Sequence, residues 1–164
     1  MADELGWQLI SPSEEPMQVL QKMMRSKLII TEAMHGAIVA DTLRIPWIPY
    51  SGFSTINHFK WSDWCLSMDL KYEPIQLKPF FSNDFSERLI QENLSKKGLV
   101  KNKGLVRILE YAVRWKMDKR WKSNVATLKA AAKLSDAYMS KDEVFNDRLG
   151  RMMKKLHEVK EMIK

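Results

Sequence analysis

The sequence predicts an α/β protein, in which residues 1–84 form part of a Rossmann-like parallel sheet and residues 85–164 form a helical extension. The first part alternates short apolar runs with helical patterns, whereas from Phe85 onward the pattern is wholly helical. The charge also changes between the two parts. Residues 1–84 hold 7 Lys/Arg and 10 Asp/Glu, a net charge of −3, and residues 85–164 hold 20 and 10, a net charge of +10. This asymmetry indicates two parts with different roles.

The elements follow in order from the N-terminus. Trp7–Ile10 is an apolar run stopped by Ser11 and Pro12, and it predicts a first strand. Pro16 suits the first turn of a helix, where its missing N–H does no harm. Residues 28–31 are apolar at consecutive positions up to Thr31, as is typical of a strand buried on both faces.

A short helix over residues 37–43 has almost no polar surface, so we expect it to be buried. The extended segment 46–50 contains Pro46 and Pro49, which favour a sheet edge or a strand end. Strands that alternate with helices imply parallel pairing with crossover connections. Three strands make a thin sheet, however, and its open edge would need a partner.

The helical extension has two cap signals and one apolar stripe. Ser123 or Asn124 could cap one helix, and the spacing of Ser140 and Glu143 predicts a capping box for the last helix. The stripe of the last helix has gaps that alternate between four and three residues: Phe145, Leu149, Met152, Leu156, Val159 and Ile163. It is shorter than the three or four heptads that would predict a true coiled coil.

Composition excludes several classes of protein. Cys65 is the only cysteine, so no internal disulfide can form, and no Cys/His spacing typical of a metal site is present. No apolar stretch approaches the roughly 20 residues that span a bilayer. The N-terminus carries acids where a signal peptide carries Lys or Arg. We therefore expect a cytoplasmic protein, able to lie peripherally on the inner face of the cell membrane, that uses no metal and no cofactor.

The junction between the second strand and the short helix is the candidate site. Thr31, Glu32, His35 and Gly36 lie where a parallel strand ends and a helix begins, and ligands of open α/β sheets bind at that edge. A helix N-terminus there attracts phosphate or carboxylate. An imidazole beside a bound phosphate could become a proton donor. The alternative is a Glu–His pair that only positions a loop, and the pattern alone leaves both readings open.

Three further segments admit two readings each. Trp61 and Trp64 could form a platform for a sugar ring, although aromatic residues at this spacing belong more often to a core. Lys60 could contact a phosphate as a point charge. Asp41 lies inside its predicted helix, where a hydrogen bond between helix and loop is favoured over catalysis.

Four segments, in this order, resemble the polysaccharide pyruvyl transferase family, in particular its exopolysaccharide-biosynthesis branch. They are residues 10–12 (Ile-Ser-Pro), 31–41 (Thr-Glu-Ala-Met-His-Gly-Ala-Ile-Val-Ala-Asp), 44–47 (Arg-Ile-Pro-Trp) and 59–64 (Phe-Lys-Trp-Ser-Asp-Trp). The resemblance covers about residues 5–75. Residues 85–164 contribute nothing diagnostic.

The resemblance implies transfer of the pyruvyl group of phosphoenolpyruvate to two hydroxyls of a sugar or lipid-linked oligosaccharide, which gives a ketal and phosphate. It implies the C-terminal half of a GT-B-type architecture. The histidine of the family's Arg-x-His motif corresponds to His35, and its arginine corresponds to Ala33, which leaves another phosphorylated donor open. Glu32 and His35 would be catalytic. The expected contacts divide into a donor set, Gly36, Ala37, Thr31, Ser11 and Lys60, and an acceptor set, Trp61 and Trp64.

A GT-B-type enzyme needs about two domains, more than this chain offers. We therefore expect the chain to be incomplete on its own, and to pair with an N-terminal-half partner chain or with copies of itself.

The basic extension predicts a function of another class. A non-catalytic interaction module could bind a partner chain or an anionic membrane through the Lys and Arg side chains between positions 96 and 122. The alternative is a solvated face that keeps the protein soluble. No nucleic-acid motif is present, so nucleic acid is not an expected partner.

Overall fold

The computed structural model describes residues 1–163 except 53–55, 80–87, 89–91, 93–94 and 97–102. The chain divides into two units. One comprises Met1–Leu9 and Gln76–Ala131, and the other, which contains the sheet, comprises Ile10–Ile75 and Ala132–Lys164. The predicted boundary between residues 84 and 85 falls outside the described residues and stays a prediction.

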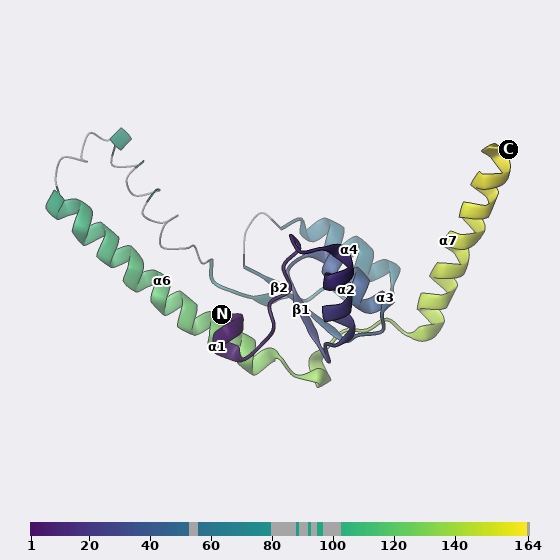
Figure 1. The fold of residues 1–164 in the computed structure, drawn as a ribbon, viewed down its shortest axis with the longest axis horizontal. Helices are drawn as coiled ribbons and strands as arrows, with labels where there is room; N and C mark the ends of the chain where they lie inside the picture. The colour runs from purple at the N-terminus through teal and green to yellow at the C-terminus, as the bar shows by residue number, and fades with distance from the viewer. Residues whose placement is uncertain (53–55, 80–87, 89–91, 93–94, 97–102, 164) are drawn as a thin grey trace. The chain divides into compact units, whose positions relative to one another are not determined.

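The sheet-containing unit is built on a strand–helix–strand element. Strand β1 (Ile29–Thr31) runs parallel to β2 (Trp47–Ser51), and α3 (Met34–Thr42) connects them (Figure 1). A short β3 (Ile75–Gln76) completes the order β1-β2-β3. The predicted α/β class, the second strand and the short buried helix are confirmed. The GT-B-type architecture stays a prediction.

Pro46 directly precedes β2, in agreement with the predicted strand end, whereas Pro49 lies inside β2 and does not mark a sheet edge, because β2 is the central strand. The backbone N–H of Ile29 donates to Pro46 O, whereas the N–H of Trp47 donates to Tyr138 O on the opposite side of the strand. Backbone groups of successive residues point to alternate sides of a strand, so Pro49, like Trp47, faces away from β1. Its missing N–H therefore costs no hydrogen bond between β1 and β2, which is why the strand tolerates it.

A single apolar core joins the sheet to three helices. Helix α2 (Pro16–Met24) begins at Pro16 as predicted, and α4 (His58–Ser67) covers the sheet together with α3 (Figure 1). The buried core side chains come from all of these elements: Met23, Ile29, Ala37, Ala40, Ile45, Trp47, Trp61 and Cys65.

The prediction of a first strand over Trp7–Ile10 is wrong, since these residues form neither strand nor helix. A short α1 (Ala2–Leu5) precedes them and ends at Gly6, whose φ of 68° is left-handed and suits glycine. The apolar run was too short to distinguish a strand from an extended connection.

The other unit contains α6 (Lys103–Ala131), which runs without interruption through Ser123 and Asn124. The predicted cap at these residues is therefore wrong. Asn124 is buried and serves a different purpose, because its Oδ1 accepts from Lys78 N at 2.9 Å while its Nδ2 donates to Lys78 O at 2.8 Å. The Asn124 side chain thus satisfies both backbone hydrogen-bonding groups of Lys78.

The chain ends with a 3₁₀ turn (Leu134–Asp136) and α7 (Asp142–Ile163). Ser140 lies two residues before α7, so the predicted capping box is not formed. Among the described residues, no helix has both the length and the apolar character needed to cross a membrane.

Candidate functional site

The strand-to-helix junction is shaped by a turn around Thr31. Its Oγ1 accepts a hydrogen bond from Ala33 N at 3.1 Å and donates to Ala33 O at 3.0 Å. This side chain replaces a backbone turn and leads β1 directly into α3. Ala33 occupies the N-cap position with an extended conformation and no capping side chain. The residue at the position of the family's arginine therefore marks the start of the helix.

Gly36 lets the first turn of α3 approach the strand end. A Cβ atom at this position would lie 2.6 Å from Thr31 Oγ1, a clash that the rigid turn could not relieve cheaply. The backbone N–H of Gly36 donates to Ala33 O at 2.9 Å, and that of Ala37 to the same oxygen at 3.3 Å. The N–H groups of Gly36 and Ala37 are therefore occupied, and the side chain of Ala37 is fully buried. The donor contacts expected of these two residues stay a prediction.

The next N–H groups toward the start of α3 belong to Met34 and His35. Neither donates a hydrogen bond to any residue that the structure describes. The first N–H groups of a helix lack intrahelical partners and carry its partial positive charge. The N–H groups without a described partner thus lie two residues earlier than Gly36 and Ala37, and the anion site expected at this junction stays a prediction.

The side chain of His35 is exposed, and no hydrogen bond from it to another described residue is present. It stands on the second residue of α3, beside the two N–H groups. An accessible imidazole at a helix N-terminus can meet a ligand that arrives from solvent. A buried ring, or one whose nitrogens were hydrogen-bonded within the protein, could not meet such a ligand.

Glu32 connects the ends of the two parallel strands. Its Oε1 accepts a hydrogen bond from Gly52 N at 2.7 Å, which joins the residue after β1 to the residue after β2. Burial raises the pKa of Tyr50, and the nearby charge of Glu32 raises it further. No hydrogen bond joins Glu32 to His35 among the described residues, so the expected Glu–His pair is not formed. Glu32 positions the edge of the sheet through Gly52 instead.

Ser11 and Lys60, the other two expected donor contacts, are not linked to this junction. Ser11 belongs to a local turn in which its N–H donates to Glu14 at 3.0 Å. Lys60 is exposed in the first turn of α4, where its N–H donates to Asn57 Oδ1 at 3.1 Å. Within the described chain, no hydrogen bond or ion pair joins either residue to Thr31, Glu32 or His35.

The tryptophans of α4 belong to the core rather than to a sugar platform. Trp61 is 3% exposed and stacks on Tyr72 with ring centroids 5.0 Å apart. Trp64 is half-buried and lies 5.2 Å from Trp47, centroid to centroid. The burial of Trp61 among other aromatic rings favours the core interpretation, and the acceptor role expected of Trp61 and Trp64 stays a prediction.

Two weakly acidic side chains, the buried Cys65 and the half-buried Tyr72, belong to this core. The hydroxyl of Tyr72 is buried without a hydrogen-bond partner among the described residues, and burial raises its pKa to about 12. Burial also raises the pKa of the Cys65 thiol to about 11, with a smaller contribution from the charge of Asp41. Both groups are neutral near pH 7, so neither serves as a nucleophile there.

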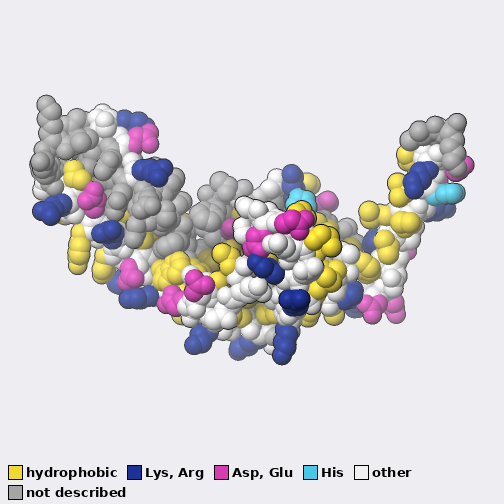
Figure 2. Space-filling view, viewed as in Figure 1, with side chains coloured by type: hydrophobic (Ala, Val, Ile, Leu, Met, Phe, Trp, Pro, Cys, Tyr) yellow, Lys and Arg dark blue, Asp and Glu magenta, His cyan; other side chains and the backbone are white. Residues whose placement is uncertain are grey.

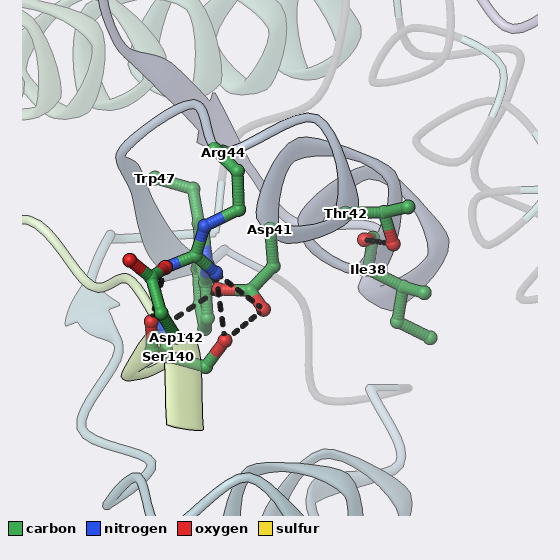
Figure 3. Close-up of polar contacts among 7 residues, drawn as sticks. All are labelled: Ile38, Asp41, Thr42, Arg44, Trp47, Ser140 and Asp142. Carbon is green, nitrogen blue, oxygen red and sulfur yellow. Dashed lines mark hydrogen bonds and ion pairs between the residues drawn. The ribbon is translucent and has the colours of Figure 1, made fainter. Parts of the chain in front are cut away.

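A polar network around Asp41 fixes the opposite end of α3 (Figure 3). Asp41 is 1% exposed, and its Oδ1 accepts from Trp47 Nε1 at 3.2 Å and from Ser140 N at 2.8 Å. The Ser140 hydroxyl donates to Asp41 Oδ2 at 2.5 Å. Arg44 completes the network, since Nη1 donates to Ser140 Oγ at 3.0 Å and Nη2 lies 2.6 Å from Asp142 Oδ1.

This network confirms the preference for a helix–loop hydrogen bond at Asp41. It also explains why Ser140 does not cap α7, because its hydroxyl is used by Asp41. No local sequence signal predicts this pairing, because Asp41 and Ser140 lie 99 positions apart. The network joins the C-terminal end of α3 and β2 to the segment before α7, and its central members, Asp41 and Ser140, are buried, which indicates a structural role.

Within the described chain, no group of three His, Cys, Asp or Glu side chains is placed to hold a metal ion.

Comparison with known proteins gives one informative match. No family model matches the chain, and no solved structure matches it. The chain is similar to the succinoglycan biosynthesis protein ExoV of Rhizobium meliloti (strain 1021), with 42% identity over 74 residues. The match covers 45% of this chain and 23% of that protein, so less than a quarter of the relative is represented here.

Proposed function

We propose that this chain acts in exopolysaccharide biosynthesis as a pyruvyl transferase-like protein. The observation that supports it is the 42% identity to a succinoglycan biosynthesis protein. The resemblance of the segments around His35 to polysaccharide pyruvyl transferases adds the reaction type. The sugar or oligosaccharide acceptor and phosphoenolpyruvate as donor are part of the proposal.

The junction offers what the first step of such a transfer needs. The phosphate of phosphoenolpyruvate would sit on the N–H groups of Met34 and His35, at the positive end of α3. A bound phosphate favours the protonated imidazole of His35, which could then donate its proton to the terminal carbon of the donor, where the methyl group forms. The two sugar hydroxyls form C–O bonds to the adjacent carbon as the bond to phosphate breaks. Of the two hydroxyl protons, one leaves with phosphate and the other restores the imidazolium.

Glu32 contributes through position and charge. Its bond to Gly52 holds the two strand ends together, so the start of α3 is presented from a rigid edge. Its second oxygen makes no hydrogen bond to a described residue and could accept a proton from a sugar hydroxyl. We therefore assign Glu32 to positioning the edge and to the acceptor side of the reaction.

The chain supplies only part of the enzyme in this proposal. Ala33 replaces the arginine that would clamp the anionic donor, so a cationic group must come from elsewhere. The relative extends well beyond the matched segment, which supports a further domain or partner chain that faces this edge. We expect little turnover from the purified chain until that part is added.

The test measures phosphate release from phosphoenolpyruvate in the presence of an acceptor oligosaccharide and the missing half of a related enzyme. His35→Ala should abolish release and leave the thermal unfolding midpoint nearly unchanged, because the side chain is exposed and makes no hydrogen bond to a described residue. His157→Ala is the matched control, since His157 is also exposed but lies on α7. Full release by His35→Ala would refute the catalytic assignment and leave the non-catalytic interaction module as the better account.

A further inference from the structure

Helix α7 presents an apolar face that nothing in the described structure covers. Every residue from 149 to 162 is exposed, on all sides of the helix. The apolar residues are nevertheless gathered along it, with side chains between 46% and 85% exposed: Leu149, Met152, Met153, Leu156, Val159 and Met162 (Figure 2). A face of this kind marks an interaction site, because solvated helices do not normally sort their apolar residues to one side.

The charges of α7 are sorted as well. Residues that lie three, four or seven apart share a side of a helix. By this rule Lys155 borders the apolar face on one side and Lys160 borders it on the other. Lys154 and Glu161 lie on the reverse side, and Glu158 lies between the two sides, with its Oε2 3.0 Å from Lys155 Nζ. Cations at the margins, with the acids farther from the apolar face, match an anionic, apolar partner.

A second copy of the chain does not fit this pattern. If the stripe formed the seam of a coiled coil, Lys155 and Lys160 would occupy the two positions that flank it. In a parallel pair, Lys155 of one copy would face Lys160 of the other. In an antiparallel pair, each lysine would face its own equivalent. Both arrangements place like charges together, so self-association is disfavoured.

The width of the apolar face favours a membrane surface over a partner helix as the binding partner. Met153 and Met162 lie beside the seam positions and widen the apolar face to about half of the helix circumference. A coiled-coil seam is narrower, whereas a helix that lies in a membrane interface buries about this fraction of its surface. Lysines at the margin can then extend their ammonium groups toward lipid phosphates while their methylene groups stay in the apolar layer.

We propose that α7 binds an anionic lipid surface, lying in the plane of the membrane with the Leu149–Met162 face inserted and Lys155 and Lys160 on the headgroups. The attachment uses residues outside the candidate site and does not depend on the proposed reaction.

Flotation of the full chain with vesicles tests the proposal. Vesicles of equal parts phosphatidylglycerol and phosphatidylcholine should carry the protein, vesicles of phosphatidylcholine alone should carry far less, and added salt should reduce binding. Leu156→Gln should weaken binding by about tenfold or more, through lost apolar insertion. Lys160→Gln should weaken it by about fivefold. Lys154→Gln removes the same charge from the reverse side and should have a smaller effect.

Far-ultraviolet circular dichroism of each variant should match the parent chain, since all of these side chains are exposed. Equal flotation of the parent and Leu156→Gln would overturn the proposal, as would equal binding to both vesicle types. Sedimentation that shows a dimer dissociated by Leu156→Gln would identify a second copy as the partner instead. Binding to soluble poly-glutamate as tight as to vesicles would also overturn it, because charge alone would then suffice.

Discussion

Removing the Asp41 carboxylate should destabilise the sheet-containing unit more than any other single polar change near α3. In Asp41→Ala, two buried donors lose their acceptor: the indole N–H of Trp47 and the backbone N–H of Ser140. Each unsatisfied buried donor costs about 1–3 kcal/mol, and Arg44 also loses a nearby carboxylate. We expect the free energy of unfolding to fall by about 3–5 kcal/mol.

Urea unfolding followed by tryptophan fluorescence measures this loss, because Trp47 belongs to the network. Thr42→Ala is the control from the same turn of α3: its exposed hydroxyl only donates to Ile38 O, so the change should stay within about 0.5 kcal/mol (Figure 3). Asp41→Asn retains one acceptor oxygen and should fall between the two. Should Asp41→Ala not fold, Ser140→Ala removes only the hydroxyl bonds to Asp41 and Arg44, and it should cause a smaller loss that still exceeds that of Thr42→Ala. An Asp41→Ala loss no larger than that of Thr42→Ala would refute the reasoning.

Two further predictions concern stability. Gly36→Ala should lower the thermal unfolding midpoint, although alanine favours helices more than glycine does, because its Cβ would meet Thr31 Oγ1. Gly150→Ala is the control: a Cβ there meets nothing, so it should stabilise α7 by up to about 1 kcal/mol. A higher midpoint for Gly36→Ala would contradict the close approach. The folded state holds the protons of Cys65 and Tyr72 more tightly than the unfolded chain, since their pKa values are raised to about 11 and about 12. The contribution of these groups to the free energy of unfolding should therefore be fully present below the ordinary thiol pKa of 9.0 and should be lost as the pH rises toward these values. The loss should be shallower in Cys65→Ala. Urea unfolding at several pH values measures it, and an equal dependence on pH in both proteins would contradict this prediction.

The sequence predicted the elements whose signals are local and strong. The Pro16 helix start, the apolar run before Thr31 and the nonpolar helix that follows all depend on residues close in sequence, and the structure confirms them. Trp7–Ile10 had too few residues to define a period, and its prediction failed. The preference for a structural bond at Asp41 was correct because a carboxylate inside a buried helix must find donors.

The failures share a physical cause, which is competition from distant partners. Ser140 has the local spacing of a helix cap, but Asp41 offers its hydroxyl and backbone N–H a buried acceptor. Asn124 resembles a cap and instead satisfies both backbone groups of Lys78. The Glu32–Gly52 bond likewise replaces the expected pairing with His35. Such partners cannot be inferred from spacing, because the fold alone decides which distant group arrives.

The assignment of His35 as the group that meets a phosphorylated donor is tested most directly by titrating its ring. Nuclear magnetic resonance of the chain's three histidines, His35, His58 and His157, can follow each imidazole as phosphoenolpyruvate is added. A phosphate bound at the start of α3 should shift the His35 ring signals and leave those of the other two histidines unchanged. An unmoved His35 ring, or an equal response of all three histidines, would contradict the account.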